Sequence, residues 1–200
     1  MRRSLSILTV LITWLAIASV VCADRPNILW ITAEDMSATL GCYGDQFAIT
    51  PNLDRLAARG VRYANAVGIT GVCAVNRSCL ITGMYSSTIG SQDMRSRIRL
   101  PESIRTHSHY LRQAGYYTTN NVKTDYNTAN AAEIIRASWD ESSDSAHWRG
   151  RPEGKPFFAV FNLMTSHQSR SMVWSDEQFR EEVQSHLSDN EIHNPAAVPV

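Results

Sequence analysis

Three short apolar segments are spaced along the chain, and each runs directly into charged or polar residues. They cover residues 27–32, 116–122 and 157–164. Short runs rich in β-branched and aromatic residues, bounded by polar residues, are typical of buried strands. Helical patterns separate the three segments. The sequence therefore predicts an α/β fold with a largely parallel central sheet and helices on both faces.

The helices are expected from their start and stop signals. Thr50-Pro51 is a good helix start and Gly60 a stop, while Ser175 and Gln178 form a capping box at the last helix. Between these, helices are expected from near residue 76 to 83 and from Pro101 to 115. Residues 139–154 are polar and rich in turn residues, so we expect a surface loop there, whose aromatic residues could line a sugar site.

Polar side chains follow all three predicted strands. Glu34-Asp35 comes after the first, Lys123 after the second and His167 after the third. Because the carboxyl ends of parallel strands meet at one edge of a sheet, we expect these groups to converge there. Each could also be an ordinary capping or solvated surface residue. Adjacent carboxylates nevertheless suit a hard cation such as Ca²⁺.

Cys73 and Arg77 lie where a glycine-rich loop meets a predicted helix. The free N–H groups of a helix start favour a bound anion, and an arginine suits a tetrahedral oxyanion. The same edge of the sheet would then gather a thiol, cations and carboxylates. This convergence indicates chemistry on an anionic group rather than a plain structural domain.

Composition narrows the class of partner. The chain has 200 residues, 44% of them hydrophobic, with 19 basic and 19 acidic residues and a formal net charge of zero. A chain of this length supports one domain, and the lack of basic bias argues against nucleic acid as a partner.

Residues 1–23 have the pattern of a signal peptide: Arg2 and Arg3, an apolar stretch, then small residues at a cleavage site. The apolar stretch is short and interrupted for a membrane span, so no stable membrane insertion is expected, although a span or a lipid anchor on Cys22 are alternatives. Export leaves Cys42, Cys73 and Cys79, an odd number, with a Cys42–Cys79 disulfide as one possibility.

Several motifs occur in a fixed order. They are Ile31-Thr32-Ala33-Glu34-Asp35-Met36, Thr50-Pro51-Asn52-Leu53-Asp54-Arg55-Leu56-Ala57, Cys73-x-x-x-Arg77 with Leu80-Ile81-Thr82-Gly83, Gly115-Tyr116-Tyr117 leading to Lys123, and Pro156-Phe157-Phe158 leading to His167. Over about residues 25–170, this order resembles the N-terminal part of a type I, formylglycine-dependent sulfatase of the alkaline-phosphatase-like superfamily.

The resemblance implies a role for each site residue. Cys73 would be converted to formylglycine by a formylglycine-generating enzyme, and its hydrated aldehyde would attack a sulfate ester. Glu34, Asp35 and the modified Cys73 would bind Ca²⁺. Arg77 would hold the hydrate, Lys123 would bind the sulfate, and His167 would contact the sulfate or protonate the leaving oxygen.

Three residues depart from the family pattern. Val75 stands where proline is usual, Glu34 where aspartate is usual, and Asp125 where a histidine usually follows the lysine. The family's remaining metal ligands and a second lysine come from a segment farther along. The expected organisation is thus a signal peptide over 1–23 and an incomplete catalytic domain over 24–200.

The resemblance implies an exported, periplasmic or extracellular sulfuric ester hydrolase acting on a sulfated carbohydrate or an aryl sulfate. A phosphoester or phosphonate hydrolase of the same superfamily is one alternative. A truncated, non-catalytic relative is another.

Overall fold

The computed structural model describes residues 25–169, 173–182 and 184–186. The predicted signal peptide lies outside the described residues, so it stays a prediction, as does the domain boundary at residue 24. Within the described part of the chain, every helix is too short or too polar to cross a bilayer.

Within these described residues, the centre of the fold is a parallel sheet of four strands in the order β1-β4-β2-β3. The strands are β1 (Ile28–Ala33), β2 (Tyr117–Asn121), β3 (Glu141–Ser142) and β4 (Phe157–Leu163). The three apolar segments therefore form strands as predicted. The last of them, β4, lies between the other two, with Phe158 opposite both Ile28 and Thr118.

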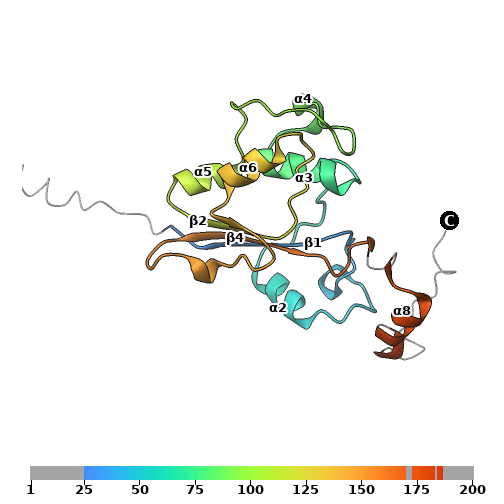
Figure 1. The fold of residues 1–200 in the computed structure, drawn as a ribbon. Coiled ribbons are helices and arrows are strands. Elements are labelled where there is room, and N and C mark those ends of the chain that lie inside the picture. Colours follow the sequence, from blue (N-terminus) through green and yellow to red (C-terminus); the bar gives the residue numbers. More distant parts are fainter. Residues whose placement is uncertain (1–24, 170–172, 183, 187–200) are drawn as a thin grey trace, which may run out of the picture.

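Helices cover both faces of the sheet, as expected (Figure 1). One face carries α3, α5 and α6, and the other carries α2. The helices are α2 (Pro51–Arg59), α3 (Cys73–Thr82), α4 (Ser86–Ile89), α5 (His107–Gln113), α6 (Ala131–Ser138) and α8 (Asp176–Glu182), with 3-10 turns at Gly41–Tyr43, Trp148–Gly150 and Gln184–His186.

The core lies between the sheet and the layer of α3, α5 and α6. It is built on Phe158, which is 2% exposed and stacks on Trp139 at 5.7 Å between ring centroids. Tyr116, Tyr126 and Ile81 complete the buried cluster. Burial of large aromatic rings is the main stabilising contribution to such a layer.

Two sequence expectations about segments are wrong. The helix expected from Pro101 begins only at His107, because Thr106 is the better cap: its Oγ1 accepts from the His109 N–H at 3.0 Å. The segment from Trp139 is not simply a surface loop, because it contains β3 and Trp139 is 5% exposed. Its Trp148 stacks on Phe157 of β4 at 5.5 Å.

The capping box of the last helix is confirmed. The Gln178 N–H donates to Ser175 Oγ at 3.2 Å, and the Ser175 N–H donates to Gln178 Oε1 at 3.1 Å. The helix starting at Pro51 is also confirmed, and its apolar residues Leu53 and Leu56 are exposed.

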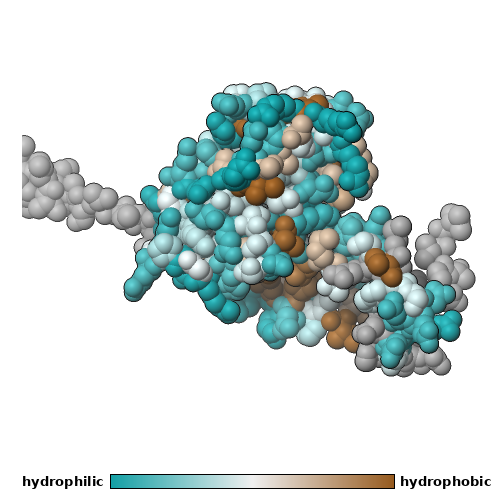
Figure 2. All heavy atoms as spheres, in the orientation of Figure 1, coloured by the Kyte–Doolittle hydropathy of each residue, from teal (hydrophilic) through white to brown (hydrophobic). Residues whose placement is uncertain are grey.

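The α2 side of the sheet is covered less completely than the other. Leu29 and Ile31 of the edge strand β1 are 49% and 58% exposed. Figure 2 shows hydrophobic, brown surface between the sheet and α2. Among the described residues, the well-packed core thus lies on one side of the sheet only.

His107 joins α5 to the helix that carries Cys73. One face of its ring lies near Trp30 and Phe158, at 5.4 and 5.5 Å between centroids, and Nδ1 lies 3.2 Å from the Leu80 carbonyl oxygen. Its Nε2 is buried with no hydrogen-bond partner among the described residues. Burial lowers the pKa of His107 below its usual value of 6.5, so the folded protein favours the neutral ring.

This lowered pKa predicts a loss of stability in mild acid. The unfolded chain takes up a proton at His107 below about pH 6.5, while the folded chain resists it, so the free energy of unfolding should fall as the pH drops through that value. Urea unfolding at pH 7.5 and 5.5 should show a smaller difference for His107→Gln than for the wild type. An equal difference in both would contradict the assignment.

Candidate active site

The polar residues that follow the strands do meet at one edge of the sheet. Glu34 extends the β1–β4 ladder by one step, with its N–H donating to the Leu163 carbonyl at 3.1 Å. Ser166, just after β4, donates to the Glu34 carbonyl at 2.5 Å. The backbone thus fixes Glu34 where the strands end, beside Lys123 and His167.

Glu34 is the buried charge at the centre of this edge. Its Oε1 pairs with Arg77 Nη1 at 3.0 Å and its Oε2 with Lys123 Nζ at 2.7 Å. The side chains are only 7% exposed for Glu34 and 11% for each cation. A charge removed from water needs such pairing, so the three side chains hold one another in place.

Arg77 connects α3 to the loop that follows β2. Its Nε donates to the Thr124 carbonyl at 2.8 Å and its Nη2 to the Lys123 carbonyl at 2.5 Å. Together with the bond to Glu34, the planar guanidinium uses donors in three directions. A lysine could not make this set of bonds, because it has one nitrogen.

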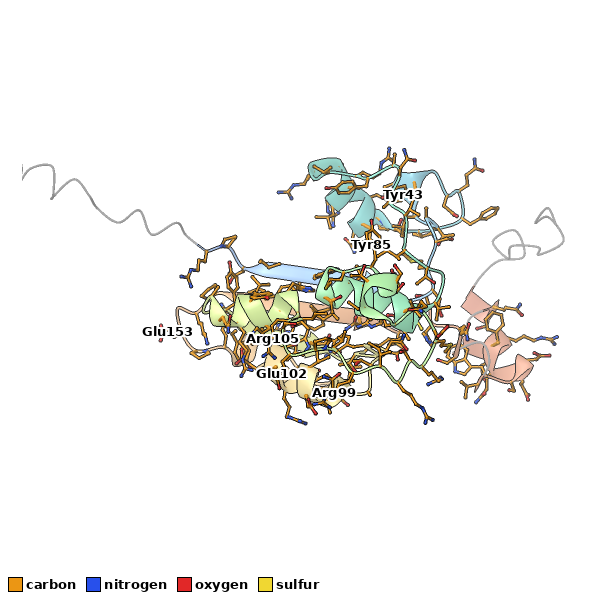
Figure 3. All side chains as sticks on the ribbon, turned by 90° about the horizontal axis from the view of Figure 1, so that it is seen from above. Tyr43, Tyr85, Arg99, Glu102, Arg105 and Glu153 are labelled. Atoms are coloured by element: carbon orange, nitrogen blue, oxygen red, sulfur yellow. The ribbon has the colours of Figure 1, made fainter. Side chains whose placement is uncertain are left out.

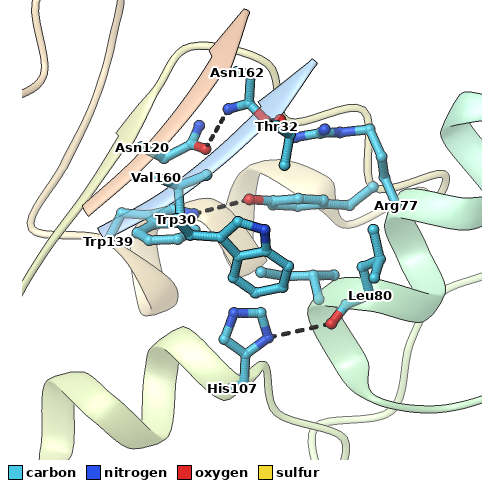
Figure 4. Close-up of a pocket in the computed structure, with 11 residues that line it drawn as sticks. Trp30, Thr32, Arg77, Leu80, His107, Asn120, Trp139, Val160 and Asn162 are labelled. Carbon is cyan, nitrogen blue, oxygen red and sulfur yellow. Dashed lines mark hydrogen bonds between the residues drawn. The ribbon is translucent and has the colours of Figure 1, made fainter. Parts of the chain in front are cut away.

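Below the charged cluster, a row of polar side chains crosses the sheet from strand to strand. Thr32 Oγ1 donates to Asn162 Oδ1 at 3.0 Å, and Asn162 Nδ2 donates to Asn120 Oδ1 at 3.0 Å. Asn120 Nδ2 then donates to Ser142 Oγ at 3.1 Å. Figure 4 shows the middle of this row above an apolar pocket lined by Trp30, Leu80 and other residues.

Cys73 is the first residue of α3, three positions earlier than the sequence suggested. No side chain in the described part of the protein caps this helix start, and the first helical bond runs from the Asn76 N–H to the Val72 carbonyl at 2.9 Å. The N–H groups of the first turn therefore remain available to an anion. Val75 lies in that turn, where a proline would also be tolerated because its missing N–H costs no helical bond.

Asp35 and His167 face each other at the rim. The Asp35 backbone is left-handed, with φ of 50°, and its Oδ2 lies 3.9 Å from His167 Nε2. Asp35 Oδ2 also accepts from the Gln168 N–H at 2.9 Å, and His167 Nδ1 lies 2.7 Å from Ser169 Oγ. The rim is thus tied to the segment just after β4.

Asp125 lies directly at the thiol, which the sequence alone did not establish. Its Oδ2 is 3.8 Å from Cys73 Sγ, and its backbone is left-handed with φ of 46°. The next residue, Tyr126, is buried and accepts a bond from Trp139 Nε1 at 3.0 Å. Burial raises the pKa of Tyr126 to about 12, so this anchor of the loop stays uncharged.

A cleft of about 580 Å³ opens over these groups. Its walls come from the end of β1, from the loop before α3 and from the first turns of α3, and include Glu34, Asp35, Cys73 and Arg77. Lys123 and His167 lie beside Glu34 but do not line the cleft. All three cysteines in the described residues are free thiols, so the structure contradicts a Cys42–Cys79 disulfide.

The donor atoms match a metal site in part. One ligand atom each from Glu34, Cys73 and His167 lies within 4.8 Å of the others. Thiolate and imidazole alone would favour a softer ion than Ca²⁺. An oxygen in place of the sulfur at residue 73, together with Glu34 and the neighbouring Asp35, makes an oxygen set that suits Ca²⁺. With that change, the residues present fit the metal.

Comparison with known proteins identifies the family. The sulfatase family model matches residues 26–195. The chain belongs to the sulfatase family, and its parallel sheet with flanking helices is the alkaline-phosphatase-like fold of that family. Cys73, Arg77 and the strand-end charges therefore lie within a sulfatase domain.

Particular relatives are similar over parts of their length. The chain is 44% identical over 158 residues to an ulvan-active sulfatase of Formosa agariphila, covering 73% of this chain and 26% of that one. It is 36% identical over 96 residues to iduronate 2-sulfatase of Mus musculus, covering 48% and 17%. The chain thus spans about a quarter of the first relative and less of the second.

Solved structures support the fold alone, since their identities are low. A protein in complex with its substrate D-glucosamine-2-N,6-O-disulfate matches with a TM-score of 0.60 and 22% identity, over 72% of this chain and 35% of that one. A 2-O GAG sulfatase matches with a TM-score of 0.59 and 19% identity, over 72% and 36%.

The buried cluster predicts a large effect of Arg77. Arg77→Met leaves Glu34 with one cation and removes the guanidinium donors to the Thr124 and Lys123 carbonyls, of which the second keeps its bond from Asn120. The free energy of unfolding should therefore fall by about 3 kcal/mol. Arg77→Lys should recover only part of this, because it cannot reach both carbonyls. Chemical denaturation measures each change.

A matched control is available on the surface. Arg99 pairs with Glu133 at 2.6 Å, but both side chains are more than half exposed. Arg99→Met should therefore cost less than about 1 kcal/mol. Equal costs for Arg77→Met and Arg99→Met would show that the buried cluster contributes nothing special.

Proposed function

We propose that this chain forms the N-terminal part of a sulfuric ester hydrolase that acts on a sulfated carbohydrate or an aryl sulfate. The observation that supports it best is the buried cluster of Glu34, Arg77 and Lys123 beside the uncapped helix start at Cys73. Cations and free N–H groups around a cleft are suited to a tetrahedral anion. The sulfated substrates of the relatives agree with this class.

Cys73 is the residue proposed to carry the reaction, after conversion to formylglycine by a formylglycine-generating enzyme. The modified side chain supplies a hydrated aldehyde as the nucleophile. The chain's own part is to hold that side chain at the start of α3. Arg77, on the same helix one turn later, orients it and stabilises negative charge on it.

Lys123 and His167 are proposed to act on the substrate from the other strand ends. Lys123 is held by Glu34 at 2.7 Å, which fixes its ammonium group close to the cleft for binding a sulfate oxygen. His167 is held through Nδ1 by Ser169, which leaves Nε2 toward Asp35 and the site. A histidine so placed can give a proton to the leaving oxygen.

Ca²⁺ is the proposed metal, held by Glu34, Asp35 and the modified residue 73. When bound, it would polarise the sulfate oxygens. The three groups supply fewer oxygens than the six to eight or so that Ca²⁺ usually takes, so further ligands would complete the site.

The charges near the thiol favour sulfate over phosphate. Asp125 Oδ2 lies 3.8 Å from Cys73 Sγ, and no cation among the described residues forms an ion pair with it. A sulfate monoester carries one negative charge, whereas a phosphate monoester carries close to two near neutral pH. The Asp125 carboxylate repels the more highly charged ester more strongly, which argues against the phosphoester alternative.

Conversion of Cys73 gives the first test. We expect the Cys73 peptide of purified protein, made in cells that contain the formylglycine-generating enzyme, to show the mass of the aldehyde. Cys73→Ala should lower turnover of an aryl sulfate by at least about a thousandfold, since it removes the nucleophile.

Cys42→Ala is the matched control, because Cys42 is also a free thiol but lies outside the cleft. It should leave turnover unchanged. Unmodified Cys73 in a preparation that turns over the aryl sulfate would contradict the formylglycine mechanism. A preference for the matched aryl phosphate would favour the phosphoesterase alternative, and glycan binding without turnover would favour a non-catalytic relative.

Metal binding gives a second test that does not depend on turnover. Calcium should raise the melting temperature of the wild-type protein, because a ligand of the folded state stabilises it. Asp35→Asn should reduce this shift, since it weakens one oxygen ligand, while Glu133→Gln on the surface of α6 should not. No shift with the wild type, or an undiminished shift with Asp35→Asn, would contradict the assignment.

A further inference from the structure

Residues 95–105 carry an unusual concentration of arginine on the surface. Arg95, Arg97, Arg99 and Arg105 are all exposed, against one glutamate, Glu102, in the same stretch. We call these four arginines the arginine ridge. Figure 3 shows Arg99, Glu102 and Arg105 beside α5 and α6.

The backbone of this stretch is held in place by the segment after Tyr126. The Ser96 N–H donates to Asn127 Oδ1 at 2.9 Å, and Asn127 Nδ2 donates to the Ser91 and Asp93 carbonyls at 2.9 Å each. The three hydrogen bonds of the Asn127 side chain therefore fix the backbone at the start of the ridge. In a loop that is fully solvated, water would bond these backbone groups instead, so the bonds to Asn127 show that the stretch is ordered.

Ile98 and Leu100, farther along the stretch, are fixed in the same way. The Ile98 carbonyl accepts from the Ala129 N–H at 2.7 Å and from Thr128 Oγ1 at 2.9 Å. Asn130 bonds both the N–H and the carbonyl of Leu100, at 3.0 and 3.1 Å. From Ser96 to Leu100, the backbone is thus bonded at every second residue.

This pairing sets the direction of the side chains. Leu100 is 3% exposed and Ile98 is partly buried. Arg97, which precedes Ile98, and Arg99, which follows it, are both exposed. In an extended backbone, alternate residues are about 6.6 Å apart on one side. Arg97 and Arg99 therefore lie on one exposed side of the stretch, while Arg95, whose φ is 59°, and Arg105, which follows a turn, lie near its two ends.

Most of this positive charge is not neutralised. Arg99 pairs with Glu133 on α6 at 2.6 Å. Among the described residues, no carboxylate forms an ion pair with Arg95, Arg97 or Arg105. The ridge can therefore accept an anionic partner without first breaking an internal pair at these three positions.

One short segment joins the ridge to the active site. Arg77 binds the Thr124 carbonyl, Asp125 lies 3.8 Å from Cys73, and Asn127 binds Ser96. Asp125 and Asn127 are two residues apart, which spans at most about 7 Å of chain. The start of the ridge is thus tied through the buried side chain of Asn127 to the loop that carries Asp125.

We propose that the arginine ridge binds neighbouring sulfate groups of an extended sulfated polysaccharide while one of its sulfate esters lies at residue 73. The guanidinium fork matches a pair of oxygens on a sulfate, and several exposed forks along one stretch match a polymer better than a single sugar. The assignment of the partner rests on the proposed function. The existence of a polyanion-binding surface at the ridge does not depend on the proposed function.

The test compares a polymer with a small substrate. In the purified protein, Arg95→Asn with Arg97→Ser removes two charges, and asparagine tolerates the left-handed backbone of residue 95, where φ is 59°. We expect binding of dextran sulfate at low salt to weaken by about tenfold, with weaker dependence on salt. The KM for a small aryl sulfate should not change.

Two control variants separate charge from folding. Arg95→Lys with Arg97→Lys keeps the charge and should retain most of the binding. Arg59→Ser with Arg149→Ser removes the same charge elsewhere and should leave dextran sulfate binding unchanged. Unsulfated dextran should not bind.

Other outcomes would overturn the inference. Wild-type affinity of the Arg95 and Arg97 variant for dextran sulfate would remove the ridge as a binding surface. Single-stranded DNA that binds as tightly as dextran sulfate, through the same arginines, would replace the glycan by nucleic acid. Absence of aryl sulfate turnover in every variant would reject the proposed function, yet the binding measurements would still decide on the ridge.

Discussion

The buried carboxylate of Glu34 is the group on which the rest of this site depends. It lies just after β1, largely shielded from solvent, and both of its carboxylate oxygens form ion pairs with cations. A buried charge of this kind is costly unless its partners are rigid. Arg77 and Lys123 are therefore fixed in direction before any substrate arrives, which is the preorganisation that an anion site needs.

Support for that cluster comes from polar groups that every strand contributes. Thr32, Asn162, Asn120 and Ser142 form a continuous row of hydrogen bonds under the charges. Buried amides that are fully bonded stiffen a layer, whereas apolar side chains at the same positions would leave the loop carbonyl of Lys123 with fewer partners. The sheet below the row is held by aromatic packing on one face.

The segment from Lys123 to Asn130 connects three parts of the molecule. Its first carbonyls bind Arg77, its Asp125 faces the thiol, and its last side chains hold the arginine ridge. Left-handed residues at 125 and 127 make these sharp changes of direction possible, and asparagine and aspartate are among the residues that adopt them most easily. One loop thereby sets the spacing between the thiol and the positively charged surface.

The sequence alone determined the α/β class, the three main strands and the set of polar residues at their ends, because burial, strand length and the parallel connections are local or topological properties. It also placed Cys73 and Arg77 at a helix start. The tertiary structure decided three features that the hydrophobic periodicity of the sequence does not predict. Trp139 belongs to the core, the helix begins after Thr106 rather than at Pro101, and Asp125 faces Cys73. Each of these depends on contacts between residues far apart in the chain, whose energies are fixed only when the layers pack together.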